Sequence, residues 1–115
     1  MDDQGIKRAV KKFHIALAVA DVAQSVIDYS ARLGVSPVLV VPNEYALWRT
    51  EMLNLSIRKT TEAAGTLRHL GWEDSNATAF SIETDVNGIK WERFSAAHQT
   101  EELNSIWPDI SYKTT

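Results

Sequence analysis

The stretch that decides the fold is KKFHIALAVA, residues 11–20, in which bulky and small side chains alternate. One set of positions holds Phe13, Ile15, Leu17 and Val19, and the other holds His14, Ala16, Ala18 and Ala20. Because successive side chains of a β-strand point to opposite faces of a sheet, the stretch predicts a strand with one bulky and one small face. We expect a helix over the bulky face. The small face leaves an open volume in which His14 is the functional side chain.

The covering helix is expected directly after this strand. Asp21 and Gln24 have the spacing of a capping box, and Gly34 follows the last apolar position. Three strand-like segments come next: VLVV at 38–41, YALWRT at 45–50 and LNLSIRK at 53–59. The first half therefore has the order β-α-β-β-β. In its last strand a polar row of Asn54, Ser56 and Arg58 either lines a cavity or faces solvent.

The second half repeats the pattern of the first strand. In TLRHLGWED, residues 66–74, His69 shares one face with Leu67 and Gly71. ATAFSIET (77–84) and IKWERFS (89–95) then read as a hairpin around the turn DVNG. The tail from Ala97 to Trp107 has helical spacing and ends before Pro108, so we expect a C-terminal helix over residues 97–107.

Composition and charge narrow the class of protein. The 115 residues are a usual length for one domain, so we expect a single domain over residues 1–115. The net charge of −3 argues against nonspecific nucleic-acid binding, and no apolar run approaches the roughly 20 residues that cross a bilayer. The charged start has no apolar signal core, which favours a cytoplasmic protein. Without cysteine, histidine and carboxylate side chains remain as metal ligands.

The segment FHIALAVADVAQSVIDYSARLGVSP resembles the opening module of the vicinal oxygen chelate superfamily, which includes glyoxalases, bleomycin-resistance proteins and extradiol dioxygenases. RHLGWE is similar to the opening of that superfamily's second module, and TDVNGIKWERF to its closing hairpin. The long segment from Tyr45 to Glu73 looks most like the cadmium- or arsenic-inducible dioxygenase-like branch. The resemblance implies an α+β fold with a βαβββ module over about 13–60, a shortened second module over about 66–95, and a mixed sheet curved into a cup.

The resemblance also implies a metal site. The family's ligand positions match His14, His69 and Glu92, and a fourth family position is Asn54, where we expect a water or the amide itself to orient a substrate. Two imidazoles and one carboxylate suit a divalent ion such as Fe, Mn, Ni or Zn. An ion of this kind would stabilise an oxyanionic intermediate of the substrate as a Lewis acid.

The residues alone leave simpler interpretations open. Each of the two strand histidines could be an imidazole that is hydrogen-bonded to a backbone carbonyl, and Glu92 could be a solvated edge residue. Arg49 and Arg58 could pair with an anionic substrate through their planar guanidinium groups, or could be surface cations. We place His98 on the exposed side of the C-terminal helix and outside the site.

The second module departs from the family pattern because the segment after HLGWED leads almost directly into ATAFSIET, without the usual helix and strand. The back of the sheet could then be uncovered at Trp72, Phe80, Ile82 and Trp91. We expect the tail around Leu103, Ile106 and Trp107 to fold over that surface, and we expect a second subunit to contribute in a symmetric homodimer.

The leading functional hypothesis is a divalent-metal-dependent enzyme of the glyoxalase and dioxygenase kind that acts on a small, oxygen-bearing organic molecule. An alternative is a metal-free protein of the bleomycin-resistance type that binds or sequesters a small molecule. A third is an accessory protein that uses its sheet for partner contacts.

Overall fold

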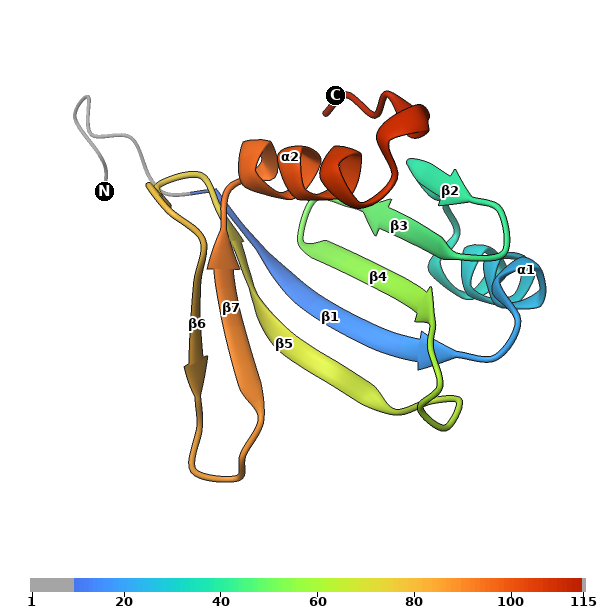
Figure 1. Ribbon diagram of the computed structural model, residues 1–115, viewed down its shortest axis with the longest axis horizontal. Helices are drawn as coiled ribbons and strands as arrows, with labels where there is room; N and C mark the ends of the chain where they lie inside the picture. The colour runs from blue at the N-terminus through green and yellow to red at the C-terminus, as the bar shows by residue number, and fades with distance from the viewer. Residues whose placement is uncertain (1–9, 115) are drawn as a thin grey trace.

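Seven strands form one mixed sheet in this computed structural model, which describes residues 10–114 (Figure 1). The strands are β1 (Lys11–Val19), β2 (Leu39–Val41), β3 (Tyr45–Arg49), β4 (Leu53–Lys59), β5 (Leu67–Asp74), β6 (Ser81–Thr84) and β7 (Lys90–Phe94). The helices are α1 (Val22–Leu33) and α2 (Ala96–Ile106), followed by a short 3₁₀ helix, η1 (Pro108–Ile110).

The sheet has the strand order β2-β3-β4-β1-β5-β7-β6. The pairs β1 with β4 and β5 with β7 are parallel, and the other neighbours are antiparallel. The sheet does not close on itself, and it curves so that one face is concave (Figure 1). The predicted α+β class, the mixed and curved sheet and the C-terminal helix are confirmed. The connection at residues 75–80 contains no helix, as the shortened second half predicts.

Helix α1 covers the bulky face of β1 and its neighbours. Its first turn is capped by the Asp21 carboxylate, which accepts a hydrogen bond from the backbone N–H of Gln24, and it ends at Gly34 in the left-handed conformation. Val22 packs into a cluster with the fully buried Trp48 and Ile57. Burial of each large side chain in this cluster contributes about 1.5–3 kcal/mol, which holds α1 against the sheet.

Helix α2 lies on the opposite face, across the side that carries His14 (Figure 1). The expectation that the tail covers the back of the sheet is therefore wrong. Phe94, the last residue of β7, packs against the His14 ring on the concave face, and the helix begins only two residues later, so the chain turns onto this face. Leu103 then anchors α2 in a cluster with Tyr45 and Leu47.

The back of the sheet beyond α1 keeps an exposed apolar side chain. Trp72 is 38% exposed there, although Phe13 packs beside its ring. Ile82, which is 50% exposed, is paired with Glu92 and so lies on the concave side, contrary to its predicted place on the back. The homodimer stays a prediction. Across residues 10–114, neither α-helix combines the length and the apolar character that crossing a membrane requires.

Candidate metal centre

A single row of residues crosses the sheet on its concave face. Its members are paired in register across five neighbouring strands: Arg49 of β3, Asn54 of β4, His14 of β1, Gly71 of β5 and Glu92 of β7. Directly paired residues of neighbouring strands project to the same face. His69 stands two positions before Gly71 on β5, so it shares that face and reaches the row from the side.

Gly71 allows this row to be compact. A Cβ atom at this position would lie 2.1 Å from the backbone oxygen of Glu92, far inside any non-bonded contact distance. Glycine therefore permits the close pairing of β5 with β7. It also leaves no side chain between His14 on one neighbouring strand and Glu92 on the other.

Three donor atoms from different strands meet at the centre of the concave face. The Nε2 atoms of His14 and His69 are 3.0 Å apart, and Oε1 of Glu92 lies 3.2 Å from Nε2 of His69 and 3.9 Å from Nε2 of His14. The side chains are 3%, 16% and 15% exposed for His14, His69 and Glu92, so the donors are shielded but reachable. The three residues predicted as metal ligands are thus brought together.

The donor triangle has the size that a small divalent ion requires. A circle through three atoms separated by 3.0, 3.2 and 3.9 Å has a radius of about 2.0 Å. Zinc binds imidazole nitrogen at about 2.0–2.1 Å and carboxylate oxygen at about 2.0–2.2 Å. His14, His69 and Glu92 could therefore hold a metal ion.

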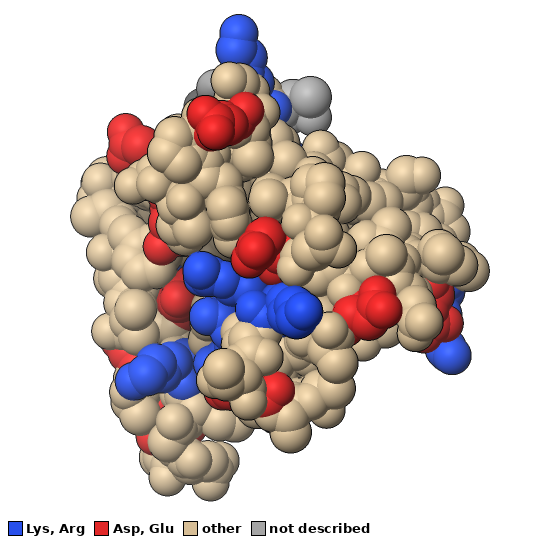
Figure 2. Space-filling model, turned by 45° about the vertical axis from the view of Figure 1, so that its right-hand side comes forward, with Lys and Arg blue, Asp and Glu red and all other residues tan. Residues whose placement is uncertain are grey.

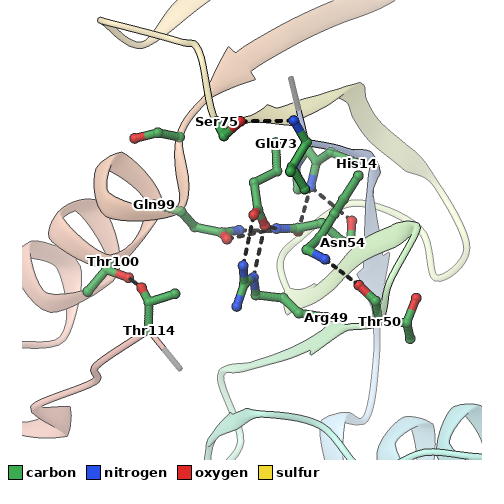
Figure 3. A network of polar contacts seen from close by, with 12 residues as sticks. His14, Arg49, Thr50, Asn54, Glu73, Ser75, Gln99, Thr100 and Thr114 are labelled. Atoms are coloured by element: carbon green, nitrogen blue, oxygen red, sulfur yellow. Dashed lines mark hydrogen bonds and ion pairs between the residues drawn. The ribbon is translucent and has the colours of Figure 1, made fainter. Parts of the chain in front are cut away.

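The tautomer of His14 follows from its partners on β4 (Figure 3). Its Nδ1 atom lies 2.9 Å from the side-chain oxygen of Asn54 and 3.1 Å from the backbone oxygen of the same residue. Neither oxygen can donate a proton, so Nδ1 must carry the hydrogen and donate it. In the neutral ring, Nε2 then presents its lone pair to His69 and Glu92, as a metal-ligating histidine does.

The Asn54 amide is itself held in one orientation. Its Nδ2 atom donates to Oε1 of Glu73 and to Oε1 of Gln99, both at a distance of 2.8 Å. Nε2 of Gln99 donates in return to the Asn54 side-chain oxygen at 3.3 Å. Since the Glu73 carboxylate only accepts, the nitrogen of the amide must face it. This leaves the amide oxygen facing the His14 ring.

Arg49 completes the chain of contacts behind His14. Its Nε and one terminal nitrogen donate to the two carboxylate oxygens of Glu73, both at a distance of 2.8 Å (Figure 3). The two side chains are 11% and 8% exposed, and a bidentate pair of this kind is strong and directional. The imidazole of a candidate ligand is thus supported by an amide, a carboxylate and a guanidinium in sequence.

The environment keeps His14 neutral. Burial lowers the pKa of His14, and the neighbouring His69 lowers it further, while the hydrogen bond to Asn54 acts in the opposite direction. For Glu73, burial alone would raise the pKa, but hydrogen bonds from Arg49 and Asn54 outweigh it and hold this pKa below its usual value. The network therefore favours a neutral imidazole in front of an ionised carboxylate.

When no ion is bound, one hydrogen on the His69 ring can link the three ligand atoms by a hydrogen bond. The lone pair of His14 Nε2 is directed inward, so Nε2 of His69 can donate its hydrogen either to His14 Nε2, at an N–N distance of 3.0 Å, or to Oε1 of Glu92, at an N–O distance of 3.2 Å. A divalent ion would take the place of this hydrogen. Metal binding would therefore require His69 to carry its hydrogen on Nδ1, so that Nε2 offers its lone pair to the ion, and a neutral ring releases no proton in this change of tautomer.

The donors open into a cavity of about 160 Å³ between the sheet and α2. Its wall includes Arg58 and Arg68 from the sheet and Glu102 and Trp107 from the C-terminal segment. Burial raises the pKa of Glu102, and the nearby negative charge of Glu92 raises it further. The cavity therefore combines a possible ligand set with fixed charges of both signs.

The other predicted site residues lie in different places. Arg58 lines the cavity, as the substrate-binding prediction requires. Asn54 is 0% exposed and is absent from the cavity lining, so its amide holds His14 instead of facing a substrate. Arg49 is likewise turned into the protein by Glu73, which corrects its predicted contact with a substrate. His98 is half-buried and caps α2 through Ser95, outside the site.

Sequence reasoning missed three residues that shape the site. Glu73 continues the parity of His69 and Gly71 along β5, so strand alternation contained the signal for it. Gln99 and Glu102 reach the site only because α2 docks on the concave face, which no local pattern indicates. The chain matches no protein-family model and no curated protein, so a role for this site is inferred from its residues and geometry.

Proposed function

We propose that this chain is a divalent-metal-dependent enzyme that acts on a small, oxygen-bearing organic molecule. The observation that carries the proposal is the triangle of His14, His69 and Glu92, whose donor atoms lie 3.0–3.9 Å apart at the base of a cavity. Membership of the vicinal oxygen chelate superfamily is part of the proposal and is supported by the sequence resemblance. Fe, Mn, Ni and Zn ions all suit two imidazoles and one carboxylate.

The chain's own residues would prepare the site for such chemistry. Asn54 keeps the His14 lone pair directed at the ion position, and Phe94 packs edge-on against the His14 ring with a centroid distance of 4.9 Å. Three protein donors leave coordination positions for substrate oxygens, as in catalytic zinc sites. When bound, the ion would supply Lewis-acid stabilisation of negative charge on a substrate oxygen. Glu102, with its raised pKa, is placed on the cavity wall where it could hold a proton.

A metal-free binding protein is the second candidate. The cavity wall contains Phe94, Leu103, Ile106 and Trp107, and apolar and aromatic side chains of this kind can bind an organic ligand without a reaction. This candidate needs no ion between His14, His69 and Glu92. The hydrogen bond donated by His69 would then link the three side chains at all times. Metal content separates the two candidates.

The experiment is elemental analysis of protein that is purified without chelator and then incubated separately with Fe(II), Mn(II), Ni(II) and Zn(II) salts. We expect about one ion per chain in the wild type and in His98→Ala, which removes the histidine that lies outside the site. We expect almost none in His69→Ala. Stoichiometric metal in His69→Ala, or none in the wild type with any of the four ions, would reject the metal-dependent enzyme.

A further inference from the structure

Arg58 is held at the cavity in an arrangement unlike that of the other arginines in the described chain. Its guanidinium carbon lies 5.0 Å from the centre of the Trp107 ring, which fixes the side chain by a cation–π contact. Both residues line the cavity that contains the three donor atoms. A planar cation is therefore positioned on the wall of the site.

The other arginines between residues 10 and 114 already have carboxylate partners. Arg32 pairs with Asp28, Arg49 with Glu73, Arg68 with Glu62 and Arg93 with Asp74, at N–O distances of 2.8–3.7 Å. Over the same residues, Arg58 has no carboxylate within 4.0 Å and no hydrogen bond from its guanidinium to another residue; its charge acts at longer range on Glu102, whose pKa it lowers against the larger effect of burial. Its donors remain available to a molecule in the cavity.

Charge balance in the cavity favours an anion once an ion is bound. Arg68 is paired with Glu62, so Arg58 contributes the uncompensated positive charge, and Glu92 and Glu102 contribute at most two negative ones, when both are ionised. A divalent ion at the three donors would then leave a net positive cavity. On the face shown in Figure 2, Lys and Arg side chains gather near the middle with Asp and Glu side chains around them. Because the signs are mixed, anion recognition must come from particular side chains and not from a uniformly basic surface.

We infer that Arg58 recognises a carboxylate, and that the substrates of the proposed enzyme are small carboxylic acids whose further oxygen faces His14, His69 and Glu92. The inference rests on the proposed function. The guanidinium fork matches a carboxylate in two parallel hydrogen bonds, which an ammonium group cannot reproduce. The cavity of about 160 Å³ is smaller than the roughly 300–1,000 Å³ of drug-sized sites, so it fits an acid of only a few carbon atoms.

The test compares pyruvate with pyruvamide, which has nearly the same shape but no charge, by titration calorimetry on Mn(II)-loaded protein. Hydrogen bonds to charged groups predict that the wild type binds pyruvate about 10- to 100-fold more tightly than pyruvamide. In Arg58→Gln we expect this preference to fall below about threefold because the paired donor is lost. Arg58→Lys should keep part of the preference, since it retains the charge and loses the fork. Arg32→Gln, which removes an arginine from an exposed ion pair on α1, should leave the preference unchanged.

Binding of Mn(II) is measured first without any acid, which separates the two proposals. If the wild type binds neither Mn(II) nor any of the other three ions, the proposed function is rejected. A wild type that binds Mn(II) but shows equal affinity for pyruvate and pyruvamide, or binds neither at millimolar concentration, overturns only the inference about Arg58. The inference about Arg58 would also be wrong if folded Arg58→Gln still preferred pyruvate. The same holds if Arg58→Lys preferred pyruvate as strongly as the wild type does. If Arg68→Gln loses the preference and Arg58→Gln keeps it, Arg68 and not Arg58 recognises the carboxylate, and the inference is wrong.

Discussion

The Asn54 side-chain oxygen accepts a hydrogen bond of 2.9 Å from Nδ1 of His14, and this contact sets the direction in which a buried imidazole offers its lone pair. The two residues are 40 positions apart in the chain, yet they are paired in register on adjacent parallel strands. The contact explains why a fully buried amide lies directly behind the donor triangle. It also makes the candidate metal site depend on residues that would not touch a bound ion.

Replacement of Asn54 by leucine should weaken metal binding without removing a ligand. Loss of a partner that orients a ligating histidine typically lowers metal affinity about 10- to 100-fold. The buried N–H of His14 and the Glu73 carboxylate would each lose a partner, so the free energy of unfolding should fall by about 1–3 kcal/mol for each unsatisfied group. Calorimetric metal titration and urea unfolding measure the two effects. The exposed Asn76, changed to alanine, is the control, and equal metal affinity in Asn54→Leu and wild type would contradict the account.

Stability of the metal-free protein should decrease as the pH falls below about 6.5. The pKa of His14 is lowered from its ordinary value of 6.5, so in this range the unfolded chain takes up a proton that the folded chain does not. The folded state is therefore disfavoured by up to about 1.4 kcal/mol for each pH unit, until the pH reaches the folded pKa. The lowered pKa of Glu73 adds a loss of the same sign below its ordinary value of 4.5.

Urea unfolding at pH 8, 6.5, 5.5 and 4.5 measures this dependence. The part of the decrease that begins near pH 6.5 should be smaller in His14→Gln, whose side chain does not titrate. His98→Ala should keep the wild-type slope in this range. A free energy of unfolding that stays constant or rises between pH 6.5 and 5.5 would show that His14 is not held neutral.

Gly71→Ala should disrupt the site from within the sheet. The added methyl group would lie 2.1 Å from the backbone oxygen of Glu92, so β5 and β7 must separate. Overpacking of this kind typically lowers the free energy of unfolding by about 1–3 kcal/mol, and it should move Glu92 away from the two histidines. Chemical unfolding and metal titration test both effects, with Ser81→Ala on the exposed strand β6 as the control. Wild-type stability and metal affinity in Gly71→Ala would contradict the close pairing.

Leu103→Ala tests whether α2 is docked on the concave face. Leu103 is 3% exposed and packs with Val41, Tyr45 and Leu47. Removal of a buried leucine side chain lowers the free energy of unfolding by about 2–5 kcal/mol. Ile27→Ala, at a position of α1 that is 74% exposed, should change it by less than about 0.5 kcal/mol. Similar small changes in both variants would mean that α2 does not pack as described.

The homodimer is tested by static light scattering at micromolar concentration. A dimer has twice the chain mass of 12.9 kDa, and the exposed Trp72 on the back of the sheet is part of its expected contact surface. Trp72→Asp should then shift the mass toward that of one chain, whereas Ile27→Asp on α1 should not. A wild type that scatters as a single chain at all concentrations would rule the dimer out.

The strand pattern predicted which residues share a face, because alternation is local. His14 and His69 each sit among small residues or a glycine, and the positions on both sides of them are bulky, so their common face could be read from the chain. The separations of 3.0–3.9 Å among the donors could not, since they depend on the register of three strands that are distant in sequence.

The wrong expectations concern residues whose environment is set by tertiary packing. Asn54 and Arg49 are on the predicted face, but Glu73 and Gln99 occupy their polar groups before a substrate could. The apolar positions of α2 predicted a packed helix without saying which face of the sheet it covers. The turn of the chain after Phe94 decides this, and it also brings Glu102 and Trp107 to the cavity.

The most direct test of the central claim is a crystal structure of the protein soaked with Zn(II), with the ion located from its anomalous scattering. The account predicts one strong peak within about 2.0–2.3 Å of Nε2 of His14, Nε2 of His69 and a carboxylate oxygen of Glu92. The Nδ1 atom of His14 should remain bonded to Asn54. An ion bound elsewhere, or no peak near these three side chains at saturating zinc, would contradict the account.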